Sequence, residues 1–159
     1  MNTPKDEAHE KLRAWASGLY PLEAATELLI RAFNGRFAEP GWPWIHTTAQ
    51  DHWIDFSTIG EQIAGLSGGE QRFLRIAASI GSTDATVNLG DCLTGMDRPR
   101  LQLVLAAIAH AAGSHEHREV TRRPDGTLAL TTPGPAHPWT ASASTASETS
   151  SSNAPRRSL

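Results

Sequence analysis

A capping box that contains two glycines is the sequence feature that most constrains this chain. Ser67 is followed by Gly68 and Gly69, and Glu70 stands three positions after the serine. In such a box the serine hydroxyl accepts a hydrogen bond from the third helical N–H, and the glutamate accepts one from the serine N–H. Apolar residues then recur at helical spacing, at Phe73, Ile76, Ala77 and Ile80. The sequence therefore predicts a helix over residues 67–80.

Amphipathic spacing, capping residues and turn residues predict the remaining elements. Further helices are expected over residues 5–17, 21–34 and 97–113, with a helical turn over 58–64. Strands are expected over residues 52–56 and 85–89, and a hairpin over residues 118–132. Pro124, Asp125 and Gly126 supply the turn of that hairpin.

Together these elements predict an α/β fold with a small mixed or parallel sheet, packed helices and an N-terminal helical pair. We expect residues 1–132 to form one domain. From Pro133 onward the composition changes to proline, and then to serine, threonine and alanine. Such a segment cannot bury enough apolar surface to offset its ordering entropy, so we expect a disordered tail over residues 133–159.

Charge and cysteine content narrow the classes of function. The 159 residues carry 14 Lys and Arg against 17 Asp and Glu, a net charge of −3. This balance argues against a general nucleic-acid-binding surface. Cys92 is the single cysteine, so no internal disulfide is expected. Residues 1–17 lack the apolar core of a signal peptide, and no apolar run approaches the length of a membrane span. We therefore expect a soluble cytoplasmic protein.

Two segments in the middle of the chain resemble motifs of ABC-type ATPases. Leu66–Arg72 reads Leu-Ser-Gly-Gly-Glu-Gln-Arg, which is similar to the signature loop of the SMC, Rad50 and RecF-like branch. Leu93–Asp97 reads Leu-Thr-Gly-Met-Asp and resembles the D-loop of that family. Ser67 and Asp97 lie 30 positions apart, close to the family spacing, with a helix after each motif. The resemblance covers residues 66–113, about a third of the chain.

The resemblance implies a nucleotide-binding role for five residues of this chain. In the family, the signature loop contacts the γ-phosphate of ATP that the opposite subunit holds. A helix N-terminus suits this task because its free N–H groups carry a partial positive charge. The implied nucleotide-binding residues are Ser67, Gly68, Gly69, Glu70 and Asp97.

The chain departs from the family where catalysis would occur. Alignment on Asp97 places Gly90 at the magnesium ligand and Asp91 at the catalytic glutamate. A shift by one residue would instead make Asp91 the magnesium ligand and leave Cys92 in place of the base. In either alignment one carboxylate is missing, which weakens metal binding. Asp91 is thus a candidate catalytic residue, although an aspartate there could equally cap the following turn.

No Walker A sequence occurs in the 159 residues, so no phosphate-binding loop is supplied by the chain itself. We therefore expect a degenerate ABC-like accessory or regulatory module that is not an ATPase on its own. ATP would be bound only in trans, with a Walker A-containing ATPase subunit or a second copy as partner. The alternatives are a structural or protein-interaction protein that keeps the framework without nucleotide chemistry, and a small DNA-associated regulator.

Other clusters offer weaker candidate sites. His110, His115 and His117, with Glu116, follow the last predicted helix, and a second group contains His46, Asp51, His52 and Asp55. The first group could hold a metal, and the second a metal or an acid–base pair, but polar side chains at the surface explain both, and no metal site is predicted. Three arginines of the predicted hairpin could contact phosphate, or could simply form a solvated edge: Arg118, Arg122 and Arg123.

Overall fold

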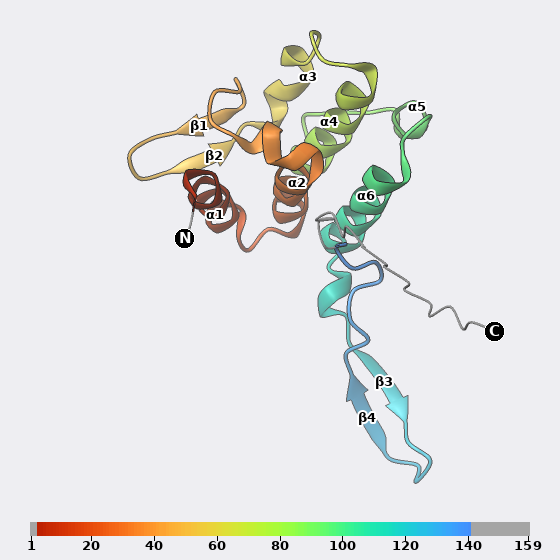
Figure 1. Ribbon diagram of the computed structural model, residues 1–159. Helices are drawn as coiled ribbons and strands as arrows, with labels where there is room; N and C mark the ends of the chain where they lie inside the picture. The colour runs from red at the N-terminus through yellow and green to blue at the C-terminus, as the bar shows by residue number, and fades with distance from the viewer. Residues whose placement is uncertain (1–2, 141–159) are drawn as a thin grey trace, which may run out of the picture.

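The computed structural model describes residues 3–140 (Figure 1). Its α-helices are α1 (Pro4–Ala16), α2 (Tyr20–Arg31), α3 (Ile59–Gln62), α4 (Gly68–Gly81), α5 (Leu89–Leu93) and α6 (Arg98–Ala111). Short 3-10 helices are η1 (Ala32–Ala38), η2 (Phe56–Thr58) and η3 (Ser114–Glu116). The strands are β1 (Ile45–Thr47), β2 (His52–Ile54), β3 (Glu119–Arg122) and β4 (Leu128–Thr131). None of the helices described has the length and apolar character needed to cross a membrane.

The predicted N-terminal helical pair is confirmed. α1 begins at a capping box in which Thr3 and Asp6 bond each other's backbone, and α2 begins with Pro21 in its first turn. α2 is the central helix of the body, because it packs against α1, α4 and α6 (Figure 1). Its inward face is fully buried, at Ala24, Ala25, Leu28 and Leu29.

α2 ends earlier than the sequence predicts, because three residues after it turn left-handed. Phe33, Asn34 and Gly35 have φ values of 51°, 60° and 73°. Only glycine fits the third position, since a Cβ there would stand 2.6 Å from Cε1 of His9. This turn lies within η1 and redirects the chain after α2.

An aromatic core lies beyond this turn. Trp44 is fully buried, and its indole N–H donates to the carbonyl of Phe37 at 2.9 Å. The Trp42 ring stacks on that of Trp44 with centroids 4.8 Å apart. Phe33 meets Phe73 of α4 edge to face, at 5.4 Å. α4 is thereby fixed against the N-terminal half of the chain.

Packed helices with a small sheet component are confirmed, and the sheet component, expected as one mixed or parallel sheet, consists of two separate hairpins. Both sheets are two-stranded and antiparallel, with β1 paired to β2 and β3 paired to β4. The buried strand expected over residues 85–89 is not formed. Asn88 instead caps α5, since its side chain accepts from the N–H of Asp91 at 3.4 Å. Thr86 is exposed and Val87 only half-buried, so no buried strand face exists there.

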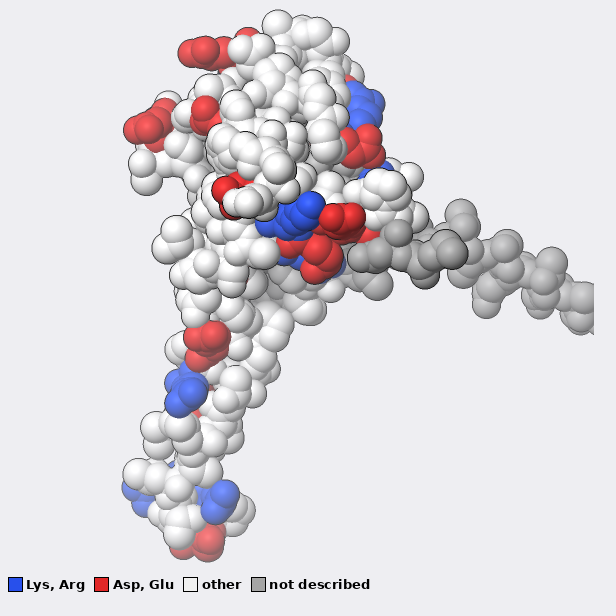
Figure 2. Space-filling view, turned by 90° about the vertical axis from the view of Figure 1, so that its left-hand side faces the viewer, with Lys and Arg blue, Asp and Glu red and all other residues white. Residues whose placement is uncertain are grey.

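The predicted hairpin is confirmed, and it projects away from the helical body (Figures 1 and 2). Residues 133–140 then return to the body, which corrects the expectation that the tail begins at residue 133. His137 contacts Gln102 of α6 at 2.7 Å, and the Arg31 guanidinium lies 5.0 Å from the centre of the Trp139 ring. The rest of the expected tail, residues 141–159, lies outside the described residues.

Candidate functional site

The predicted capping box forms at the start of α4. The Ser67 hydroxyl accepts from the Glu70 N–H at 3.3 Å, and Glu70 accepts from the Ser67 N–H at 3.0 Å. Burial opposes ionisation of Glu70, but the hydrogen bonds from Ser67 outweigh it and lower the pKa of this carboxyl. Glu70 is therefore ionised, and its carboxylate is held by Ser67 at the N-terminus of α4.

The glycine loop at this helix start is open to solvent. Ser67, Gly68 and Gly69 are all exposed, and a Cβ placed on Gly69 would meet no atom within 4 Å. The first N–H groups of an α-helix have no partner within the helix, so this end carries a partial positive charge. Approach by a negatively charged group from outside is therefore sterically unobstructed.

The structure brings the two ABC-like segments together. Gly69 and Asp97 line one small cavity of about 30 Å³, and Arg72 and Arg100 line it with them. Asp97 is the N-cap of α6, where it accepts from the Arg100 N–H at 3.0 Å and also forms an ion pair with that side chain. The N-termini of α4 and α6 therefore both border this cavity.

Arginine side chains dominate the charge around the cavity. Arg36 forms an ion pair with Glu70 at 3.2 Å, and Arg100 lies 4.4 Å from the centre of the Phe33 ring. Three guanidinium groups (Arg36, Arg72 and Arg100) stand against the two carboxylates of Glu70 and Asp97, which leaves one positive charge in excess. Two helix N-termini add to it, so the local field favours an anion. A water molecule needs about 10–15 Å³, so the cavity admits one or two oxygen atoms and not a whole nucleotide.

Asp91 does not join this cluster. It lies in the first turn of α5, is exposed, and is absent from the lining of the cavity. Without the expected strand, no strand end presents it beside the signature loop. Its neighbour Cys92 does line the cavity, but burial raises the pKa of that thiol, so it stays protonated and unreactive.

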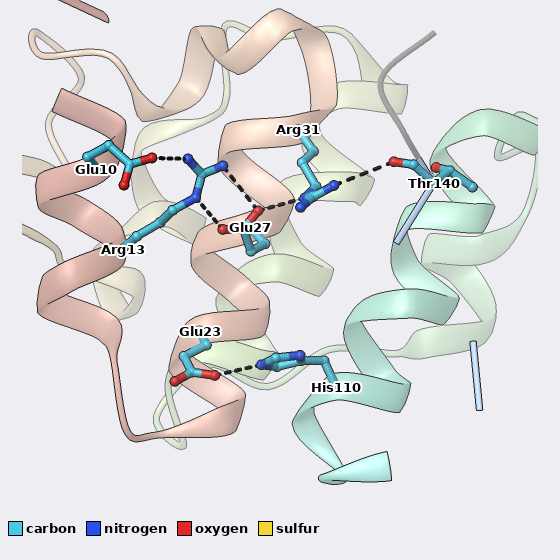
Figure 3. Close-up of polar contacts among 7 residues, drawn as sticks. All are labelled: Glu10, Arg13, Glu23, Glu27, Arg31, His110 and Thr140. Carbon is cyan, nitrogen blue, oxygen red and sulfur yellow. Dashed lines mark hydrogen bonds and ion pairs between the residues drawn. The ribbon is translucent and has the colours of Figure 1, made fainter. Parts of the chain in front are cut away.

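A second cavity, of about 250 Å³, lies between α1, α2 and α6 and is lined by an ion-pair network (Figure 3). Glu27 accepts from Arg13 and from Arg31, each at 2.6 Å. Burial opposes ionisation of Glu27, yet these two hydrogen bonds prevail and lower its pKa. Glu27 and Arg31 are neighbours on α2, but Arg13 comes from α1, so no local sequence pattern indicates the complete network. It ties α1 to α2, and both carboxylate oxygens of Glu27 accept hydrogen bonds within it.

The candidate histidine clusters are only partly assembled. Nε2 of His110 donates to the Glu23 carboxylate at 2.6 Å, an interaction that lowers the pKa of Glu23 (Figure 3). The His110 ring stacks on His115 at 4.1 Å, whereas His117 lies 3.8 Å from Glu119 at the base of the hairpin. In the second group, the His46 ring stacks on Trp53. Within residues 3–140, no three His, Cys, Asp or Glu side chains gather in a way that could hold a metal ion.

The three arginines of the hairpin are exposed and far from α4. Arg122 lies on β3, and Arg118 and Arg123 flank that strand. They are therefore separate from the cavity between α4 and α6. Comparisons of the chain with models of protein families, with curated proteins and with solved structures found no match.

Proposed function

We propose that this chain is a non-catalytic accessory module that contacts the phosphate end of a nucleotide held by a partner protein. One observation carries the proposal. Gly69 and Asp97, 28 positions apart in the sequence, line the same cavity together with Arg72 and Arg100. A terminal phosphate could approach the exposed glycine loop and place an oxygen atom in this cavity.

The size of the cavity supports contact in trans rather than binding of a whole nucleotide. About 30 Å³ holds phosphate oxygens but neither a base nor a ribose. Since the 159 residues contain no Walker A loop, the triphosphate would be held by a partner that has one. The arginines and helix N-termini would then neutralise the phosphate charge at the interface.

The position of Asp91 supports a role without hydrolysis. Asp91, the candidate catalytic residue, is exposed on α5 outside the cavity, and the Asp97 carboxylate that lines the cavity is paired with Arg100. Purified chain should therefore show no ATP turnover above that of buffer. Turnover that Asp91→Asn abolished would contradict the proposal.

The main experiment uses the chain as bait for ATPases, with and without a non-hydrolysable ATP analogue. Gly69→Glu adds a negative charge at the phosphate-facing surface, in open space and in a helix first turn that tolerates acidic residues. Gly60→Glu is the matched control, because Gly60 is also exposed, in the first turn of α3, with no atom within 4 Å of its Cβ position. We expect analogue-dependent recovery of a Walker A ATPase with the wild type and with Gly60→Glu, and at least tenfold less with Gly69→Glu. If the amount of ATPase recovered changed neither with the analogue nor with Gly69→Glu, nucleotide contact would be refuted.

A second candidate function is protein interaction without nucleotide chemistry. It is favoured by an exposed apolar stripe on α6 at helical spacing, formed by Leu101, Leu105 and Ile108. Ser67→Ala separates the two functions when it is compared with Thr3→Ala, since both residues belong to capping boxes. Each change should cost about 1 kcal/mol of stability. Only the nucleotide proposal expects Ser67→Ala to weaken analogue-dependent recovery more than Thr3→Ala.

A further inference from the structure

The β3–β4 hairpin has an apolar face that no other part of residues 3–140 covers. Val120, Leu128 and Leu130 project from one face, and they are 66%, 65% and 63% exposed. Every residue of the two strands is exposed except Ala129, which is half-buried. A two-stranded hairpin is at best marginally stable in water, and three or more strands are needed for independent stability. The hairpin therefore suits an added strand.

The backbone register shows which groups β3 offers to such a strand. The N–H of Arg123 donates to the carbonyl of Thr127 at 2.8 Å, so these two residues form a hydrogen-bonded pair. Hydrogen-bonded pairs alternate along an antiparallel ladder, so Thr121 and Glu119 also direct their backbone groups toward β4. Val120 and Arg122 consequently direct their N–H and C=O groups to the free edge.

We propose that this free edge pairs with the same edge of a second copy of the chain, antiparallel, to form a four-stranded sheet. Outward groups can bond only with outward groups, so Val120 must face Arg118, Val120, Arg122 or residue 124 of the second copy. Facing Arg118 would set Glu119 against Glu119, a like-charge pair. Facing Val120 would set Arg118 against Arg122, and facing residue 124 would set Arg122 against itself and meet Pro124, which has no N–H. Facing Arg122 avoids like-charge pairs and sets Pro124 only against Arg118, a pair that lies beyond the ends of both strands.

This remaining register is also complementary in charge. It sets Glu119 opposite Arg123 of the second copy, twice over because of the two-fold symmetry. Thr121 then faces Thr121 of the second copy across the axis. The two residues of each of these pairs are not hydrogen-bonded to each other through the backbone, and side chains of such pairs lie closer together than those of hydrogen-bonded pairs. The apolar side chains of both copies come to lie on one face of the joined sheet.

A second copy fits this edge better than the C-terminal residues do. Residues 141–159 contain a single bulky apolar side chain, Leu159, and cannot match the apolar face of the hairpin. The proposal is independent of nucleotide contact, since a second copy brings no Walker A loop. Loss of ATPase recovery by Gly69→Glu and loss of self-association by hairpin variants would therefore be separate results.

Crosslinking tests the register directly. Thr121→Cys should form an intermolecular disulfide under mild oxidation, and the native Cys92 is buried and should not contribute. Thr131→Cys is the matched control, because Thr131 lies on the same face of the hairpin but on β4. Rapid dimer formation by Thr121→Cys alone is the expected result. Equal crosslinking of both variants, or none, would overturn the register.

Charge exchange tests the pairing in solution. Sedimentation of the full chain should show a concentration-dependent dimer, with Glu119→Arg and Arg123→Glu each raising its Kd at least tenfold. The double variant should restore the Kd to within about threefold, because each new pair is again of opposite charge. Circular dichroism checks that the body stays folded, as expected for residues outside the core. A wild type that stays monomeric up to millimolar concentration, or a double variant that is not restored, would refute the proposal.

Discussion

Alanine substitutions of the glycines near the two ends of α4 should change stability in opposite directions. At Gly69 a Cβ would meet no atom within 4 Å, so the effect is set by the loss of backbone freedom in the unfolded chain. Alanine in place of glycine within a helix is worth about 0.5–1 kcal/mol, and we take about 0.5 kcal/mol for a first-turn position. Gly69→Ala should therefore stabilise the protein by that amount.

At Gly81 the same change meets a buried ring. A Cβ there would stand 2.5 Å from two atoms of Phe56 and 2.8 Å from a third, and Phe56 is only 3% exposed. Overpacking of a core costs about 1–3 kcal/mol, against the same helix gain of about 0.5 kcal/mol. Gly81→Ala should therefore destabilise the protein by about 0.5–2.5 kcal/mol.

Urea unfolding measures both variants. With a slope of about 2 kcal/mol per molar urea, the two midpoints should differ by about 1 M, with unchanged slopes. Gly60→Ala should follow Gly69→Ala, since its Cβ position is equally open. Equal stability of Gly81→Ala and Gly69→Ala would show that the Phe56 ring does not pack tightly against Gly81 at the end of α4. A lower midpoint for Gly69→Ala would contradict the open helix start.

Further changes test the network between α1 and α2 and the segment that follows the hairpin. Glu27→Gln should lower the free energy of unfolding by about 2 kcal/mol at neutral pH, as measured by urea unfolding. This loss lies between the losses typical of exposed and of buried ion pairs. The pKa of Glu27 lies below its usual 4.5 in the folded chain, so its contribution is complete above about pH 4.5 and is lost as the pH falls through the folded value. The wild type should thus lose stability more steeply than Glu27→Gln below pH 4.5, and parallel curves would argue against the network. Trp139→Ala should lower the unfolding midpoint, because Trp139 packs against the body and lies over Arg31.

The elements with local signals were predictable from the sequence. The start of α4 follows from Ser67 and Glu70 alone, because a capping box acts within four residues. The hairpin follows from Pro124, Asp125 and Gly126 between two strand-forming runs. The meeting of Gly69 with Asp97 was anticipated only through the family resemblance, which related two distant segments.

Elements that depend on distant partners were not predictable. Residues 85–89 contain the β-branched pair Thr86 and Val87, typical of a strand, but a strand also needs a neighbour, and no strand among residues 3–140 pairs with this segment. The left-handed turn at Phe33 depends on His9 and on the aromatic core, which a local pattern does not contain. Trp139 was the single signal that the segment after Pro133 returns to the body, and its polar surroundings obscured it.

The isolation of the β3–β4 hairpin has a consequence for amide hydrogen exchange. Since no side chain of these strands enters the core, the hairpin can open without unfolding the helical body. Amides of Thr121 and Ala129 should exchange by this local opening, whereas those of α2 should exchange only with global unfolding. The protection of the hairpin amides from exchange therefore reports binding to the β3–β4 hairpin, independent of the stability of the helical body.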